Sequence, residues 1–278
     1  ASAASPAGAT STEPAAEPPE LAPPPLPGPS PEAAPVVAEA GEAGVVAAGI
    51  PGGGSPQELR AAVLSPLHPK LVRSLRRGLQ ELQNVALDRL RRAQGRRDLE
   101  AHLPEEQTLQ GLREVADGLI MQAYQGGTRT ASQLAGRSLP QAPTPRDLDA
   151  DFLGEVAERL RGALQATLRS GLEANEALPA LSDRVEGVFG ELKGPRAEEL
   201  ASSHLVHAYE LGLLDAWSAG GVSHRRWVLG KEPRCPESRC RHNERSGPLP
   251  VGQPFPSGHE VPPVHVGCTC TTLPAEES

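Results

Sequence analysis

Large aromatic side chains are scarce in this chain of 278 residues: it has two Trp, two Tyr, three Phe and a single Met. Ala and Leu must therefore fill most of any core, and both residues favour helices. The scarcity predicts helices that pack closely on small side chains. The length is enough for one or two domains.

Long apolar runs are also missing, because no stretch reaches the roughly 20 residues that a membrane helix needs. The nearest candidate, residues 36–50, is interrupted by Glu39 and Glu42. The N-terminus lacks the basic segment followed by an apolar segment that marks a signal peptide. It begins with Ala, so we expect a processed chain or a piece of a longer polypeptide. No membrane partner is expected.

Positive charge is in the minority, since the net charge is −8. This balance argues against a dedicated nucleic-acid-binding protein. One segment is an exception: residues 70–97 carry nine Lys or Arg against Glu81 and Asp88, a local charge of +7. Its apolar positions step by three or four residues, which predicts a helix with one basic face. That face either meets DNA phosphates, an acidic partner or an anionic membrane surface, or is simply solvated.

The pattern of residues divides the chain into three predicted parts. Residues 1–56 hold 13 of the 30 prolines and read as a disordered Pro/Ala/Gly-rich linker or tail. Residues 57–194 read as a helical domain, and residues 195–278 as a helix followed by a small unit rich in Cys and His. Apolar periodicity predicts helices at residues 57–97, 104–125, 149–171, 179–192 and 195–219.

Glycine and proline set the predicted ends of these helices. Gly126 and Gly127 are expected to end the second helix, with a loop over residues 126–148. Strands are predicted at residues 222–229 and 268–273. The expected fold is mainly α with a small C-terminal β unit: a helical bundle or array followed by a module stapled by zinc or by disulfides.

All four cysteines fall within 36 positions near the C-terminus, with spacings Cys-x4-Cys and His-x2-Cys-x-Cys. Thiolates and imidazoles are the donors that zinc prefers, and four of them close a tetrahedron. The sequence therefore predicts one structural zinc, drawn from Cys235, Cys240, His265, Cys268 and Cys270. Five candidates compete for four places, and Cys270 or Cys240 is the expected spare. Two disulfides are the alternative.

The C-terminal part resembles the phage Mu protein F-like minor head proteins of the head morphogenesis family. The resemblance covers residues 195–274 and rests on a helix, a Trp in a short strand, a Cys-Pro step and a Pro-x-His-x2-Cys-x-Cys ending. The matching residues are Trp227, Cys235, Pro263, His265, Cys268 and Cys270. Thr269 stands where the family has Arg, and Ala201-Ser-Ser-His204 replaces the family's usual Arg-Thr-Glu.

The resemblance implies a structural role without catalytic residues. Such a minor capsid protein lies near the portal and acts in head assembly or in DNA packaging or injection. Portal and capsid proteins are then the partners. The location is the virion, or the host cytoplasm during assembly.

Two other functions stay open. A zinc-dependent, nuclease-like enzyme is suggested by His242-Asn243, although no His-Glu-x2-His motif is present and few acids lie between the two Cys/His clusters. A DNA-binding accessory protein would use residues 70–97. A further histidine pair, His204 and His207, shares one helix face and is expected to pack rather than to bind metal.

Overall fold

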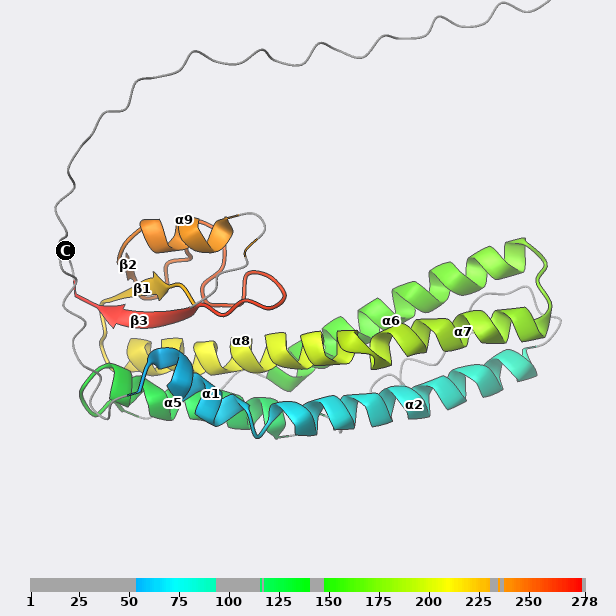
Figure 1. The fold of residues 1–278 in the computed structure, drawn as a ribbon, viewed down its shortest axis with the longest axis horizontal. Helices are drawn as coiled ribbons and strands as arrows, with labels where there is room; N and C mark the ends of the chain where they lie inside the picture. The colour runs from blue at the N-terminus through cyan, green and yellow to red at the C-terminus, as the bar shows by residue number, and fades with distance from the viewer. Residues whose placement is uncertain are drawn as a thin grey trace, which may run out of the picture. The chain divides into compact units, whose positions relative to one another are not determined.

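The computed structural model describes residues 54–93, 116, 118–140, 148–230, 235 and 238–276. These residues form seven helices and three strands, which confirms the predicted fold class (Figure 1). They belong to one compact unit, residues 48–278. Most of the predicted tract 1–56 lies outside the described residues, and the three predicted parts remain predictions.

The first predicted helix, residues 57–97, is two helices in the structure. Helix α1 spans Pro56–Leu64, and Ser55 and Glu58 close its N-terminus as a reciprocal capping box. Helix α2 spans His68–Arg92 with Pro69 in its first turn. A proline is accommodated in the first turn of a helix but not further along it, so Pro69 starts a new helix. Residues 94–97 lie outside the described part of the chain.

Helices α5 (Leu119–Leu134) and α8 (Pro195–Ala219) make the most extensive helix contact of the unit. The prediction that Gly126 and Gly127 end a helix is wrong, because α5 continues through both to Leu134. A Cβ at Gly127 would lie 2.0 Å from the Tyr209 carbonyl oxygen, and one at Gly212 would lie 2.1 Å from that of Tyr124. The glycines are therefore contact residues that let two backbones approach.

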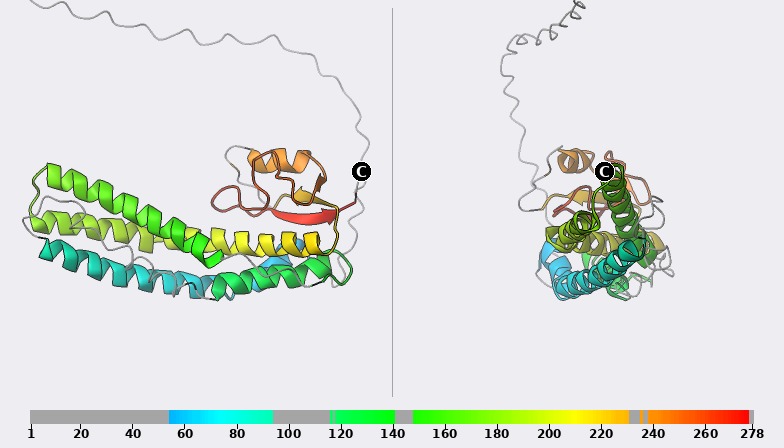
Figure 2. Two further views of the ribbon diagram at one scale, coloured as in Figure 1. Left: turned by 180° about the vertical axis from the view of Figure 1, so that it is seen from behind. Right: turned by 90° about the vertical axis from the view of Figure 1, so that its right-hand side faces the viewer.

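Helix α7 (Leu178–Lys193) packs against both α2 and α6 (Leu148–Glu173) at the other end of the helical layer (Figure 2). Most of the apolar positions that the sequence predicts for these helices are buried, but in α6 the predicted Ala163 is exposed and Leu164 is buried instead. The buried predicted positions comprise Leu71, Leu75, Leu79, Leu82, Ala86 and Leu90 of α2, Phe152, Val156 and Leu160 of α6, and Val185 and Phe189 of α7. Among the described helices, none has both the length and the apolar character needed to cross a membrane.

The three strands form one antiparallel sheet in the order β2-β1-β3. Strand β1 is His224–Val228, β2 is Leu249–Pro250 and β3 is Thr271–Ala275, and a short helix, α9, covers Arg239–Arg245. Strand β3 contacts α8, which joins the sheet to the helical layer (Figure 1). Arg225 and Trp227 alternate with more exposed neighbours and are both buried, as the predicted strand required.

The glycine contact between α5 and α8 predicts opposite effects for the same substitution at two helical glycines. Gly212→Ala should lower the free energy of unfolding by about 1–3 kcal/mol, because its methyl group must push the helices apart. Gly187→Ala on α7 has open space around the new methyl group. It should raise the free energy of unfolding by about 0.5–1 kcal/mol through helix propensity. Urea unfolding of both variants checks this, and equal effects would contradict the close contact.

Candidate metal centre

The C-terminal module has its own small core, separate from the helical one. Its buried residues are Trp227, Cys240, Phe255, Val264, Cys268 and Cys270. The rings of Trp227 and Phe255 meet edge to face with centroids 5.0 Å apart. Three of these six residues are cysteines, so sulfur atoms fill much of the space in this core.

All five predicted donors come together in this core, in two overlapping groups. In one, donor atoms of Cys235, Cys240 and His265 lie within 4.8 Å of one another, and in the other those of Cys240, Cys268 and Cys270 do. Cys240, on α9, belongs to both groups, whereas Cys270, the other residue expected as a spare, belongs to one. Cys240 is therefore the more central of the two. The cluster could hold a metal ion.

Two distances within the cluster match the edges of a metal tetrahedron. The Sγ atoms of Cys240 and Cys268 are 3.9 Å apart, and Cys240 Sγ is 3.4 Å from His265 Nε2. Usual zinc bond lengths give tetrahedral edges of about 3.8 Å between two sulfurs and about 3.6 Å between sulfur and nitrogen. These two donor pairs therefore stand near the spacing that one ion requires, whereas among the described residues each set of mutually close donors has three members.

The backbone sets the tautomer of His265. Its Nδ1 lies 2.8 Å from the carbonyl oxygen of Val266, which can only accept, so Nδ1 carries the hydrogen. The lone pair is then on Nε2, the atom that faces Cys240. Metal-binding histidines are commonly oriented in this way by a partner on the other ring nitrogen.

The four cysteines are free thiols that share hydrogen bonds unequally. A hydrogen bond from Cys268, helped by the Gly230 backbone and Trp227, lowers the pKa of Cys270 to about 5 against the opposing effect of burial. Burial and the neighbouring Cys270 raise the pKa of Cys240 to about 12. The hydrogen bond to Cys270 and burial also raise the pKa of Cys268. A bound cation would replace the protons that these thiols retain.

Asn243 and Arg225 fix the loops around the cluster. Asn243 is fully buried and bonds Ser257 twice, from Nδ2 to the hydroxyl at 2.9 Å and from the Ser257 N–H to Oδ1 at 3.0 Å. Arg225 donates to the carbonyls of Glu260 and Gln253 and lies over the Phe255 ring. The His242-Asn243 pair thus has a structural explanation through Asn243, which weakens the nuclease-like interpretation.

Sequence reasoning missed a buried ion pair behind the cluster. Arg60 of α1 and Glu210 of α8 lie 3.1 Å apart, with side chains 9% and 0% exposed. Arg60 also donates to the carbonyls of Cys270 and Thr269, and Glu210 accepts from Thr271 and Thr272. The sequence does contain a signal for this ion pair: Glu210 is the one acid in the apolar stretch 208–214 of a predicted helix. A charge on a buried helix face needs a partner.

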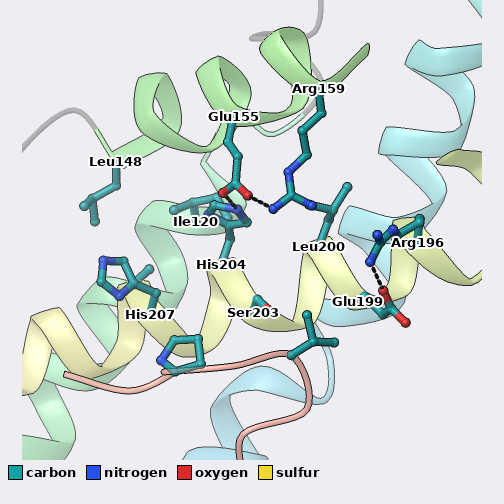
Figure 3. A pocket seen from close by; sticks show the side chains of 13 residues that line it. Ile120, Leu148, Glu155, Arg159, Arg196, Glu199, Leu200, Ser203, His204 and His207 are labelled. Carbon is teal, nitrogen blue, oxygen red and sulfur yellow. Dashed lines mark hydrogen bonds and ion pairs between the residues drawn. The ribbon is translucent and has the colours of Figure 1, made fainter. Parts of the chain in front are cut away.

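Away from the cysteine cluster, His204 and His207 line a cavity of about 320 Å³ (Figure 3). The cavity lies between α5, α6, α8 and the loop that carries Pro263 and Val266. His204 Nε2 lies 2.8 Å from Glu155, which also pairs with Arg159, and its ring packs edge-on against Phe152. Among the described residues, this pair joins no group of three potential metal ligands. These contacts agree with the predicted packing role for His204, whereas His207 is exposed.

No protein-family model, no curated protein and no solved structure matches the chain. The likeness to the head morphogenesis family therefore depends on the motif residues themselves.

The His204 environment predicts a loss of stability in weak acid. Burial lowers the pKa of His204 from 6.5, with Glu155 opposing and His207 and Arg159 adding to the shift. The unfolded chain therefore takes up the proton first, so the free energy of unfolding should fall as pH drops below about 6.5. His204→Phe, which keeps an aromatic ring against Phe152, should flatten this dependence between pH 5 and 7. Urea titrations at several pH values check it, and an unchanged slope would contradict it.

Proposed function

We propose that this chain is a structural protein whose C-terminal module is closed by one zinc ion. The observation that carries the proposal is the convergence of all five predicted donors on Cys240. Cys240 and three of the other four residues complete a tetrahedron of soft donors. The remaining donor stays beside the ion as a spare.

The donor chemistry favours a structural ion over a catalytic one. Among the described residues, the two donor groups together consist of four thiols and one imidazole, without a carboxylate that could act as general base. Cys240, Cys268 and Cys270 are all buried. Four protein ligands leave no position for a water molecule, as in structural zinc sites.

The same residues support a role in phage head assembly. Pro263, His265, Cys268 and Cys270 form the motif that resembles the minor head proteins, and Cys235 is the match to that family's first cysteine. In this chain the cysteines and the histidine lie at one site, as a working motif requires. We therefore propose a minor capsid protein that contacts portal and capsid proteins, in the virion or in the host cytoplasm during assembly.

The zinc ion is tested by metal content and thiol state. The purified protein should contain one zinc per chain and release four free thiols when the metal is removed. A chelator should unfold the C-terminal module, because the ion supplies stability that its small core lacks. Native and reducing mass spectrometry with circular dichroism measures all three. Two disulfides without metal would contradict the site and leave the head-protein role resting on the motif alone.

Substitutions distinguish the shared ligand from the spare. Cys240→Ser should abolish zinc binding, because Cys240 belongs to both donor groups. The other four donors, Cys235, His265, Cys268 and Cys270, are replaced one at a time by Ser or Ala. Only one of these four variants should bind zinc nearly as the unmodified chain does, because one of the four residues is the spare. Tight binding by Cys240→Ser would contradict the central position of this residue.

The role in assembly is tested in the phage or prophage that encodes the chain. Cys240→Ser in that genome should give defective heads in electron micrographs, and Val85→Ala, a change at a 42% exposed side chain of α2, should not. Normal, DNA-filled heads made by the Cys240 variant would contradict the proposal.

Duplex DNA binding is a second candidate function, favoured by the exposed face of α2. Lys70, Arg73 and Arg91 are exposed there. Among the described residues no ion pair neutralises these three, whereas Arg77 and Arg92 pair with Glu81 and Asp88. Exposed pairs of this kind contribute little and leave the cations accessible to phosphates.

A salt titration tests this second function. Binding to non-specific duplex should weaken steeply as salt rises, and Lys70→Gln with Arg73→Gln should lower the slope of log K against log salt by about 2. Arg184→Gln is the control, because it removes a charge from α7 and leaves the basic face of α2 unchanged. No binding at low salt would leave the basic face as a solvated surface.

A further inference from the structure

The segment that carries two of the candidate ligands is held from the helical side by charged groups. Cys268 and Cys270 immediately precede β3, so their positions depend on the backbone of residues 269–272. That backbone is contacted by the buried pair of Arg60 and Glu210.

We propose that Arg60 and Glu210 are positioning residues of the metal site, which set the metal affinity of the C-terminal module from helices α1 and α8. The inference rests on the zinc site proposed above. It adds that the helical layer takes part in metal binding without supplying a ligand.

Arg60 acts on the peptide units between the two cysteines. Its Nη1 donates to the Cys270 carbonyl and, at 3.1 Å, to Glu210, while Nη2 donates at 2.9 Å to the Thr269 carbonyl. Guanidinium groups present several donors in a fixed plane, so one side chain can hold two carbonyls and a carboxylate together. Lys at this position has a single nitrogen and would lose part of the set.

Glu210 holds the other end of the same segment. It accepts from the Thr271 hydroxyl at 2.6 Å, from the Thr272 N–H at 3.1 Å and from the Thr272 hydroxyl at 3.0 Å. With Arg60, four consecutive residues, 269–272, are hydrogen-bonded to this pair. Their backbone is therefore held by groups of the helical layer in addition to any metal ligand.

A fixed backbone lowers the cost of assembling the ligands around the ion. If the contacts to Arg60 and Glu210 hold Cys268 and Cys270 near Cys240, metal binding has less of residues 268–272 to order, and more of the metal–ligand energy appears as affinity. Groups that orient metal ligands typically change metal affinity by about 10–100-fold when they are removed. The same range is expected here.

The test separates metal affinity from stability. In the double variant Arg60→Met/Glu210→Leu, apolar groups replace the ion pair, an exchange that often preserves folding, while the contacts to residues 269–272 are lost. Chelator competition on the full chain should show zinc binding weakened about tenfold or more. The absorption bands of bound Co²⁺ should shift as the thiolate geometry changes. Arg60→Lys should recover part of the affinity.

A matched control is the exposed pair of Arg76 and Glu198, 2.9 Å apart on α2 and α8. Arg76→Met/Glu198→Leu makes the same chemical change without touching residues 269–272 and should bind zinc as the unmodified chain does. If the buried double variant does not fold, Thr272→Val keeps the ion pair and the backbone N–H contact and removes the one hydrogen bond that the Thr272 hydroxyl donates to Glu210. Several-fold weaker binding is then expected.

Each outcome has a separate meaning. A folded Arg60→Met/Glu210→Leu variant, or a folded Thr272→Val variant, with unchanged zinc affinity and an unchanged Co²⁺ spectrum overturns the positioning role while the zinc site stands. Failure of the unmodified chain to bind zinc or Co²⁺ overturns the site and the inference with it. Equal weakening in the Arg76/Glu198 control would also overturn the inference, because the effect would then not depend on residues 269–272.

Discussion

The buried carboxylate of Glu210 constrains how the helical layer and the C-terminal module fit together. A charge without solvent contact is costly unless several donors face it, and here the donors come from α1 and β3, two elements far from α8 in the chain. Arg60 forces α1 against α8, and the two threonines force the start of β3 against the same turn. Burial raises the pKa of Glu210, and Arg60 followed by Thr271 and Thr272 oppose that shift by stabilising its ionised form. If any one of these donors is removed, the Glu210 carboxylate faces apolar surroundings with fewer hydrogen bonds. Helices α1 and α8 and strand β3 must therefore assemble together.

The shortage of large aromatic side chains is met in two different ways. Between α5 and α8, Gly127 and Gly212 bring the two backbones close together, and Tyr124 and Trp217 form hydrogen bonds across the interface. In the C-terminal module, the sulfur atoms of Cys240, Cys268 and Cys270 fill part of the core beside Trp227 and Phe255. The contact between α5 and α8 depends on packing and hydrogen bonds. The C-terminal module places several thiols in one apolar space, where a metal ion could be their common partner.

Sequence periodicity predicted the elements whose burial is set along one helix or strand. The leucine stripe of α2, the span of α8 and the alternation of Arg225 and Trp227 all follow from local spacing, and the cysteine pattern located the cluster. Features that depend on a partner element were missed. Gly126 and Gly127 look like a helix end until α8 is placed against them, and Arg60 carries no sign that its partner is 150 positions away. Local propensity yields to tertiary contact at these residues.

The orientation of His265 bears on the choice between metal and disulfides. Two disulfides would use the four cysteines and leave the imidazole without a role, since a histidine takes no part in that bond. In the structure its Nδ1–H is tied to the Val266 carbonyl, and Nε2 points at a cysteine sulfur 3.4 Å away. Nε2 in this orientation could ligate a cation shared with the thiols, whereas a disulfide would make no use of it. The same holds for Cys240, because a disulfide would pair it with one sulfur, whereas a shared ion would make use of its place in both donor groups.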